Sequence, residues 1–136
     1  MTFAHIYIMY NTCYGGFTLS DAAIDEYKRR SPDGKNPRLF ELERDDQVMA
    51  QIVKEMGSAA NGQFSDIKLQ RIPVEYRDFY TIHEYDGLET VLLNHNVYQL
   101  EAIKSLVKDR TLSKTDKLAR IAAVVSQEEP KLTPEF

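Results

Sequence analysis

The sequence predicts an α/β (α+β) protein, in which a small mixed β-sheet of about four strands is packed by helices and followed by a C-terminal helical hairpin. Three observations predict this class. Stretches of alternating β-branched and aromatic residues are separated by stretches with apolar residues at helical spacing. The 136 residues have the size of one ordinary domain, with globular hydrophobic and charged fractions of 43% and 28%. The last third of the chain consists of two amphipathic stretches joined by a short polar link.

The first half of the chain predicts two strands and two helices in alternation. Residues 3–10 are rich in β-branched and aromatic side chains and form the first strand, which ends before Gly15 and Gly16. Ser20 begins a helix that ends near Arg30. Residues 38–43 alternate and predict a short second strand. Asp45 or Asp46 caps the clearest helix, whose apolar stripe is Val48, Met49, Ile52, Val53 and Met56 and which ends before Gly57.

The second half predicts two more strands and then only helices. Residues 67–73 and 78–85 form the third and fourth strands, which the short link from Pro73 joins as a hairpin. Asp86 and Glu89 have the spacing of a capping box and predict the start of a further helix. Residues 97–108 and 113–127 then form two antiparallel helices. The order of elements favours right-handed crossovers in the sheet. We therefore divide the chain into an α/β core domain (1–96), a C-terminal helical extension (97–127) and a flexible tail (128–136).

Composition excludes several classes of function. The net charge is −4, and the acidity lies in residues 1–95, with 15 Asp and Glu against 10 Lys and Arg. A general attraction to nucleic acid or anionic lipid is therefore not expected. Cys13 is the single cysteine, which rules out an intrachain disulfide or a Cys-rich zinc site. The N-terminus has no basic region and too short an apolar run for a signal or a membrane span, so we expect a cytoplasmic protein. We also expect neither a metal nor a cofactor.

Three blocks of sequence carry a resemblance that covers roughly residues 5–95. They are Cys13-Tyr14-Gly15-Gly16-Phe17 with Leu19-Ser20, then Ala60-Asn61-Gly62 before Ile67-Lys68-Leu69 and Ile72-Pro73, and finally Glu84-Tyr85-Asp86-Gly87-Leu88-Glu89. In these blocks the chain resembles a family of small uncharacterised proteins of tailed phages and large DNA viruses. The family usually continues with a His-Arg block ending in an aromatic residue, where this chain has His95-Asn96-Val97-Tyr98. The resemblance implies a viral origin, hence the host cytoplasm or a virion, and no established activity.

The junction between the first strand and the first helix is the candidate ligand-binding site. It comprises Tyr14, Gly15, Gly16 and Ser20. A helix that begins at Ser20 presents free amide groups, and two glycines allow a ligand to approach the backbone closely, which suits a phosphate or a nucleotide. The alternative is that the glycines only permit a tight turn with positive φ. A lone Gly-Gly pair lacks the spacing of a P-loop or a dinucleotide-binding motif.

The candidate catalytic residues are Cys13, His83, Asp86 and His95. Cys13 would be a nucleophile, with His83 or His95 as its base, and the carboxylates would assist proton transfer. The alternatives are a buried inert thiol, helix capping by Asp86 and solvent-facing strand residues. No HExxH or similar ligand spacing is present, so we predict no metal site and do not favour an enzyme.

Three hypotheses for function follow from these residues. The first is a viral accessory protein that binds an anionic, phosphate-bearing or nucleotide-like small molecule, in the manner of a host-defence antagonist. The second is a protein-interaction or virion-associated structural protein that binds a partner or a second copy through residues 97–126. The third is a small hydrolase or transferase that uses Cys13, His83 and Asp86. Ligand, partner and oligomeric state are left open by the sequence.

Overall fold

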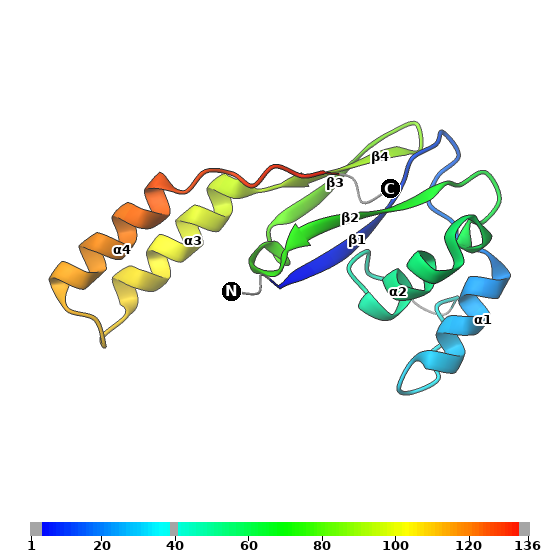
Figure 1. Cartoon of the computed structure of the whole chain (residues 1–136), viewed down its shortest axis with the longest axis horizontal. Coiled ribbons are helices and arrows are strands. Elements are labelled where there is room, and N and C mark those ends of the chain that lie inside the picture. Colours follow the sequence, from blue (N-terminus) through cyan, green and yellow to red (C-terminus); the bar gives the residue numbers. More distant parts are fainter. Residues whose placement is uncertain (1–3, 39–40, 134–136) are drawn as a thin grey trace.

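The computed structural model describes residues 4–38 and 41–133 (Figure 1). Its elements are β1 (His5–Asn11), α1 (Asp21–Arg30), α2 (Gln47–Met56), β2 (Ile67–Pro73), β3 (Tyr80–Tyr85), β4 (Leu88–Leu93), α3 (His95–Lys108) and α4 (Lys114–Ser126). Short 3₁₀ turns follow α2 at Gly57–Ala60 and β2 at Val74–Tyr76. The α/β class, a total of four strands among the described residues and the C-terminal helical hairpin are confirmed.

The strands pair differently from the prediction. β1 pairs antiparallel with β2, from His5 opposite Pro73 to Asn11 opposite Ile67. β3 pairs antiparallel with β4, so the described strands form two antiparallel ribbons and not one mixed sheet. The predicted hairpin between the third and fourth strands is therefore wrong. The reason is that β2 pairs with β1, the strand farthest from it in sequence, whereas β3 pairs with β4, the strand that directly follows it.

Alternation along β1 and β2 places two cores on opposite faces of the first ribbon. Met9, Ile67 and Leu69 pack against α1 and α2. Ile8 and Ile72, with side chains on the other face, pack against residues of the second ribbon. The first ribbon is therefore a middle layer between helices and the β3–β4 ribbon, as Figure 1 shows. A one-residue slip in its register would exchange the two cores.

The helix α2 confirms its predicted stripe and caps. Met49, Ile52 and Val53 are buried, and Val48 and Met56 are partly buried beside them. The Asp46 carboxylate accepts from the Met49 amide at 3.0 Å, and Gly57 ends the helix with φ of 60°. Ser20 likewise caps α1, because its hydroxyl accepts from the Ala23 amide at 3.1 Å.

The strand predicted over residues 38–43 is wrong for the residues described there, since Arg38 and residues 41–43 form no strand and residues 39 and 40 lie outside the description. The free edge of β1 is satisfied in another way. The Gln47 side chain accepts from the Tyr7 amide at 3.1 Å and donates to the Tyr7 carbonyl at 3.0 Å. The Met9 amide donates to the Arg44 carbonyl at 2.8 Å. A glutamine on α2 thus occupies the edge where a strand would pair.

The helix predicted to begin at Asp86 is a second error. Asp86 and Gly87 have φ of 51° and 89° and form the two-residue turn of the β3–β4 hairpin, in which Tyr85 is opposite Leu88. Asp-Gly is a preferred pair for such a turn, because both central residues need positive φ. The capping box is therefore absent, and Glu89 is a strand residue of β4.

The hairpin α3–α4 extends beyond the strands (Figure 1). Gln99 joins the two helices, since its amide donates to the Val124 carbonyl at 2.9 Å. Tyr98 attaches α3 to the core by stacking on Tyr76, with ring centroids 4.3 Å apart. Residues 128–133, the described part of the tail, form neither helix nor strand, but Leu132 packs beside the second core. Flexibility of the tail stays a prediction.

Candidate ligand-binding site

The buried side chain of Asn11 joins three loops at one end of the molecule. Its amide nitrogen donates to the carbonyls of Cys13 and Gly87, each at 2.7 Å. Its amide oxygen accepts from the backbone of Asp66 at 2.9 Å. Asn11 is completely buried, so each of these bonds replaces water that the group has lost. One residue at the end of β1 thereby holds together the loop after β1, the loop before β2 and the β3–β4 turn.

A buried ion pair supports the same end of the molecule. Both carboxylate oxygens of Glu89 accept from the Arg44 guanidinium, at 2.6 and 2.8 Å, and one also accepts from the backbone N–H of Asn11 at 2.8 Å. The Glu89 side chain is only 7% exposed. The same guanidinium lies 3.8 Å from the centroid of the Phe17 ring. Sequence reasoning missed this pair, because Glu89 was interpreted as a helix cap.

Backbone contacts between the loops explain the glycines. A Cβ on Gly15 would lie 1.6 Å from the Phe64 carbonyl oxygen, and a Cβ on Gly87 would lie 2.8 Å from the Gly16 nitrogen. Gly16 also has φ of 106°. The loops therefore approach one another more closely than any other residue type allows at these positions.

An open hollow of about 490 Å³ lies on this cluster of loops. It is lined by Cys13, Tyr14, Gly15 and Phe64. Tyr14 and Phe64 are 67% and 74% exposed, although both are large aromatic residues. Phe64 also has φ of 61°, which is rare for a bulky residue. The Cys13 thiol donates to the Phe64 carbonyl at 3.1 Å. The hollow thus combines two exposed rings with glycine backbone, and we call it the aromatic hollow.

Only some of the predicted ligand-binding residues lie at the aromatic hollow. Tyr14 and Gly15 line the aromatic hollow, whereas Gly16 and Ser20 are not among its lining residues. The Ser20 hydroxyl donates to the Ala59 carbonyl at 2.7 Å while it accepts from Ala23, so its bonding capacity is used within the protein. The first residue of α1, Asp21, carries a carboxylate that pairs with Arg38. An anion at the start of α1 would meet that carboxylate, so the hollow is the better position for a ligand.

The candidate catalytic residues do not form a connected group. Cys13 lies in the aromatic hollow, and Asp86 lies in the β3–β4 turn, which packs against the loop after Cys13. His95 lies past the other end of that ribbon, about 20 Å along the strands, where its Nδ1 is 2.7 Å from the Tyr76 hydroxyl and its Nε2 is 3.1 Å from the Gln127 carbonyl. His83 lies within β3, opposite Thr90. Among the residues described, no hydrogen bond joins any two of these four.

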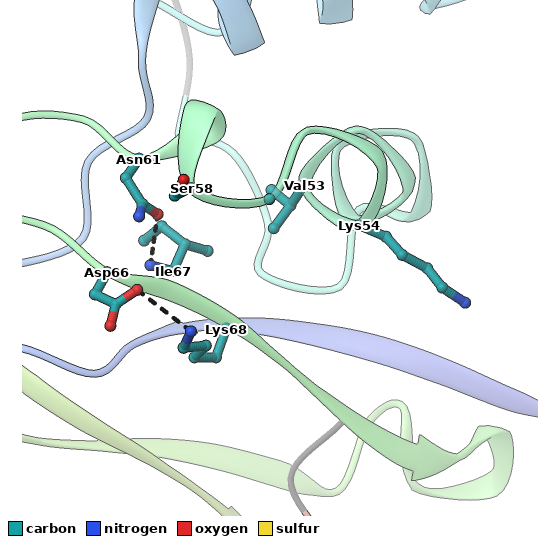
Figure 2. Close-up of a pocket in the computed structure, with 8 residues that line it drawn as sticks. Val53, Lys54, Ser58, Asn61, Asp66, Ile67 and Lys68 are labelled. Atoms are coloured by element: carbon teal, nitrogen blue, oxygen red, sulfur yellow. Dashed lines mark hydrogen bonds and ion pairs between the residues drawn. The ribbon is translucent and has the colours of Figure 1, made fainter. Parts of the chain in front are cut away.

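A second hollow lies between α2 and the start of β2 (Figure 2). Polar side chains that line it already form hydrogen bonds or ion pairs within the protein. The Asn61 amide oxygen accepts from the Ile67 backbone at 2.7 Å, and Lys68 pairs with Asp66 at 3.6 Å. Lys54 donates to the Tyr7 hydroxyl at 3.1 Å. These side chains are explained by the packing of α2 on β2, so this hollow offers fewer free groups to a ligand than the aromatic hollow.

Residues 4–38 and 41–133 contain no cluster of three His, Cys, Asp or Glu side chains able to hold a metal ion. None of the helices in these ranges combines the length and apolar character needed to cross a bilayer.

Comparison of the chain with known protein families, curated proteins and solved structures finds no match.

Proposed function

We propose that this chain is a binding protein that captures a phosphate-bearing, nucleotide-like small molecule at the aromatic hollow. The observation that carries the proposal is the pairing of Tyr14 and Phe64, two exposed rings, with the backbone of Gly15 in one hollow. Nucleobases stack on aromatic side chains, and each such contact contributes about 1–3 kcal/mol to binding. A planar ligand is therefore suited to this surface.

Phe64 supports a role in binding. A left-handed backbone conformation at a bulky residue costs on the order of 1–3 kcal/mol, and the exposed ring recovers little of that cost by packing. A glycine at this position would avoid the cost. The strain is therefore better explained by what the ring contacts outside the chain.

The glycine loop supplies the polar part of the proposed site. Among the described residues, no hydrogen bond uses the amide N–H of Gly15, which lines the hollow. A backbone amide of this kind can donate to a phosphate oxygen. Capture without turnover also agrees with the lack of a hydrogen bond among Cys13, His83 and His95, all of which are described residues. A viral accessory protein that sequesters a nucleotide-like signal would act in this way against a host defence.

The test is thermal denaturation of the full chain with a panel of mono-, di- and cyclic nucleotides, sugar phosphates and sulfate. A ligand that binds only the folded state raises the melting temperature. We expect Tyr14→Ala to weaken binding of the active compound about tenfold or more in calorimetry. Phe64→Gly is the sharper variant, because it removes the ring while it relieves the backbone strain, so the protein stays folded and loses the ligand.

Tyr85→Ala is the matched control, since Tyr85 is as exposed as Phe64 but does not line the hollow. It should bind like the unmodified protein. The proposal is overturned if no compound in the panel shifts the melting temperature. It is also overturned if the shift survives both Tyr14→Ala and Phe64→Gly.

A further inference from the structure

The helices α3 and α4, both described in full, contain no buried residue. Among the described residues, five of the nine exposed large hydrophobic side chains lie in these two helices, with exposed fractions of 50% to 63%. They are Val97, Leu100, Val107, Leu118 and Val125. An αα-hairpin is a single layer and cannot bury such residues by itself.

The exposed residues lie on one face of the hairpin. Leu100 and Val107 are seven residues apart on α3, and so are Leu118 and Val125 on α4, so each pair projects from one side of its helix. Two contacts between the helices set their relative positions. The Gln99 amide donates to the Val124 carbonyl at 2.9 Å, and the Lys117 ammonium donates to the Val107 carbonyl at 3.0 Å. Leu100 is therefore level with Val125, and Val107 is level with Leu118.

This face, which we call the hairpin face, is mainly apolar and carries two lysines. The positions three or four residues from Leu118 are Lys114, Thr115, Ile121 and Ala122. On α3, Lys104 lies between Leu100 and Val107 and pairs with Glu101 at 3.3 Å. A lysine covers apolar surface with its methylene groups while its ammonium group stays in water, so a second helix can pack here without burying either charge.

We infer that the hairpin face binds the same face of a second copy of this chain, which makes an antiparallel four-helix bundle. A two-fold interface requires a patch that is complementary to itself, and an apolar stripe meets this requirement because it needs no opposite charge in its partner. Each half-exposed Val or Leu offers on the order of 100 Å² of apolar surface. Five on each copy approach the roughly 1,000 Å² at which specific interfaces begin. The bundle completes the packing that the single hairpin lacks.

The proposal goes beyond the ligand site, which lies on other loops. It is tested by sedimentation equilibrium and light scattering of the full chain over a range of concentrations. We expect a dimer of the 15.7 kDa chain. Leu118→Glu and Val125→Glu should each weaken the dimer at least about tenfold, because each places a charge in the apolar centre of the interface.

Arg120→Glu is the control, since it changes charge on the same helix away from the hairpin face and should leave the dimer intact. Circular dichroism verifies that all variants keep their helix content. A protein that stays monomeric at every concentration overturns the proposal, and so does a dimer that both glutamate variants leave unchanged. Ligand binding to variants of Tyr14 and Phe64 is a separate measurement from the oligomeric state, so either proposal can fail while the other stands.

Discussion

Arg44 and Glu89, 45 residues apart in sequence, form a two-pronged ion pair with N–O distances of 2.6 and 2.8 Å. The pair joins β4 to the segment that precedes α2, and Arg44 also bonds to β1 through its carbonyl. It therefore connects both ribbons with the helical layer at the end of the molecule that carries the aromatic hollow.

We predict that Glu89→Ala lowers the free energy of unfolding by about 3–5 kcal/mol. The reason is that the variant removes the carboxylate that accepts from the Arg44 guanidinium and from the backbone N–H of Asn11. Urea unfolding measures the loss. The double variant Arg44→Met/Glu89→Leu should recover part of it, since it removes the charge as well. A loss below about 1 kcal/mol in Glu89→Ala would show that the pair adds little.

The contact between Gly15 and Phe64 gives a prediction about glycine. Gly15→Ala should lower the free energy of unfolding by more than about 3 kcal/mol, because the new methyl group overlaps the Phe64 carbonyl. Gly57→Ala is the comparison, since that glycine has φ of 60° but no neighbour within 4 Å of a new Cβ. Its cost should be only that of the backbone conformation, about 1–3 kcal/mol. Equal losses in the two variants would show that overlap with the Phe64 carbonyl does not determine the cost of Gly15→Ala.

The helix α2 is expected to carry the first core. Ile52→Ala should cost about 2–5 kcal/mol in chemical denaturation, because Ile52 is completely buried between α2 and the first ribbon. Gln51→Ala, an exposed position on the same helix, should change stability by less than about 0.5 kcal/mol. A cost below about 1 kcal/mol for Ile52→Ala would mean that the helix packs through another face.

Stability should fall at alkaline pH through the buried tyrosines. Burial, and then the hydrogen bond to Asp46 at 2.7 Å, raises the pKa of Tyr27 to about 12. Since this folded-state pKa lies above the usual value near 10, the protonated Tyr27 stabilises the folded state below about pH 10. That contribution is lost as the pH rises from about 10 toward 12. Urea unfolding at pH 8 and pH 11 measures the loss.

Tyr27→Phe should reduce this alkaline loss without abolishing it, because burial also raises the pKa values of Tyr76 and Tyr80 to about 12. Tyr14→Phe, at an exposed position, should leave the loss unchanged. If the stability of Tyr27→Phe falls as steeply as that of the unmodified protein, the tyrosine at position 27 is not responsible.

Removal of residues 99–136 should leave a folded core. The buried residues of the two cores all precede Tyr98, with Tyr98 and Leu132 as peripheral contacts. We expect one cooperative thermal transition by circular dichroism, at a lower melting temperature than that of the full chain. A truncated protein without such a transition would show that the hairpin and tail are required for folding.

Much of the local structure follows from the sequence because its causes are local. The apolar spacing in α2, the Ser20 and Asp46 caps, and the alternation in β1 and β2 act over a few residues, and all were predicted. The candidate ligand site was partly predicted for the same reason. Two glycines after a strand indicate a close backbone approach, and Tyr14 and Gly15 do line the hollow.

The strand pairing and the composition of the site were decided by tertiary structure. Asp86 to Glu89 satisfies the spacing of a helix cap and also the chemistry of a hairpin turn, and the burial of Glu89 against Arg44 selects the turn. Phe64 gave no signal, because its part in the hollow depends on contact with Gly15, 49 positions away in the chain. Such contacts form only when distant loops meet, and here the buried amide of Asn11 makes them meet.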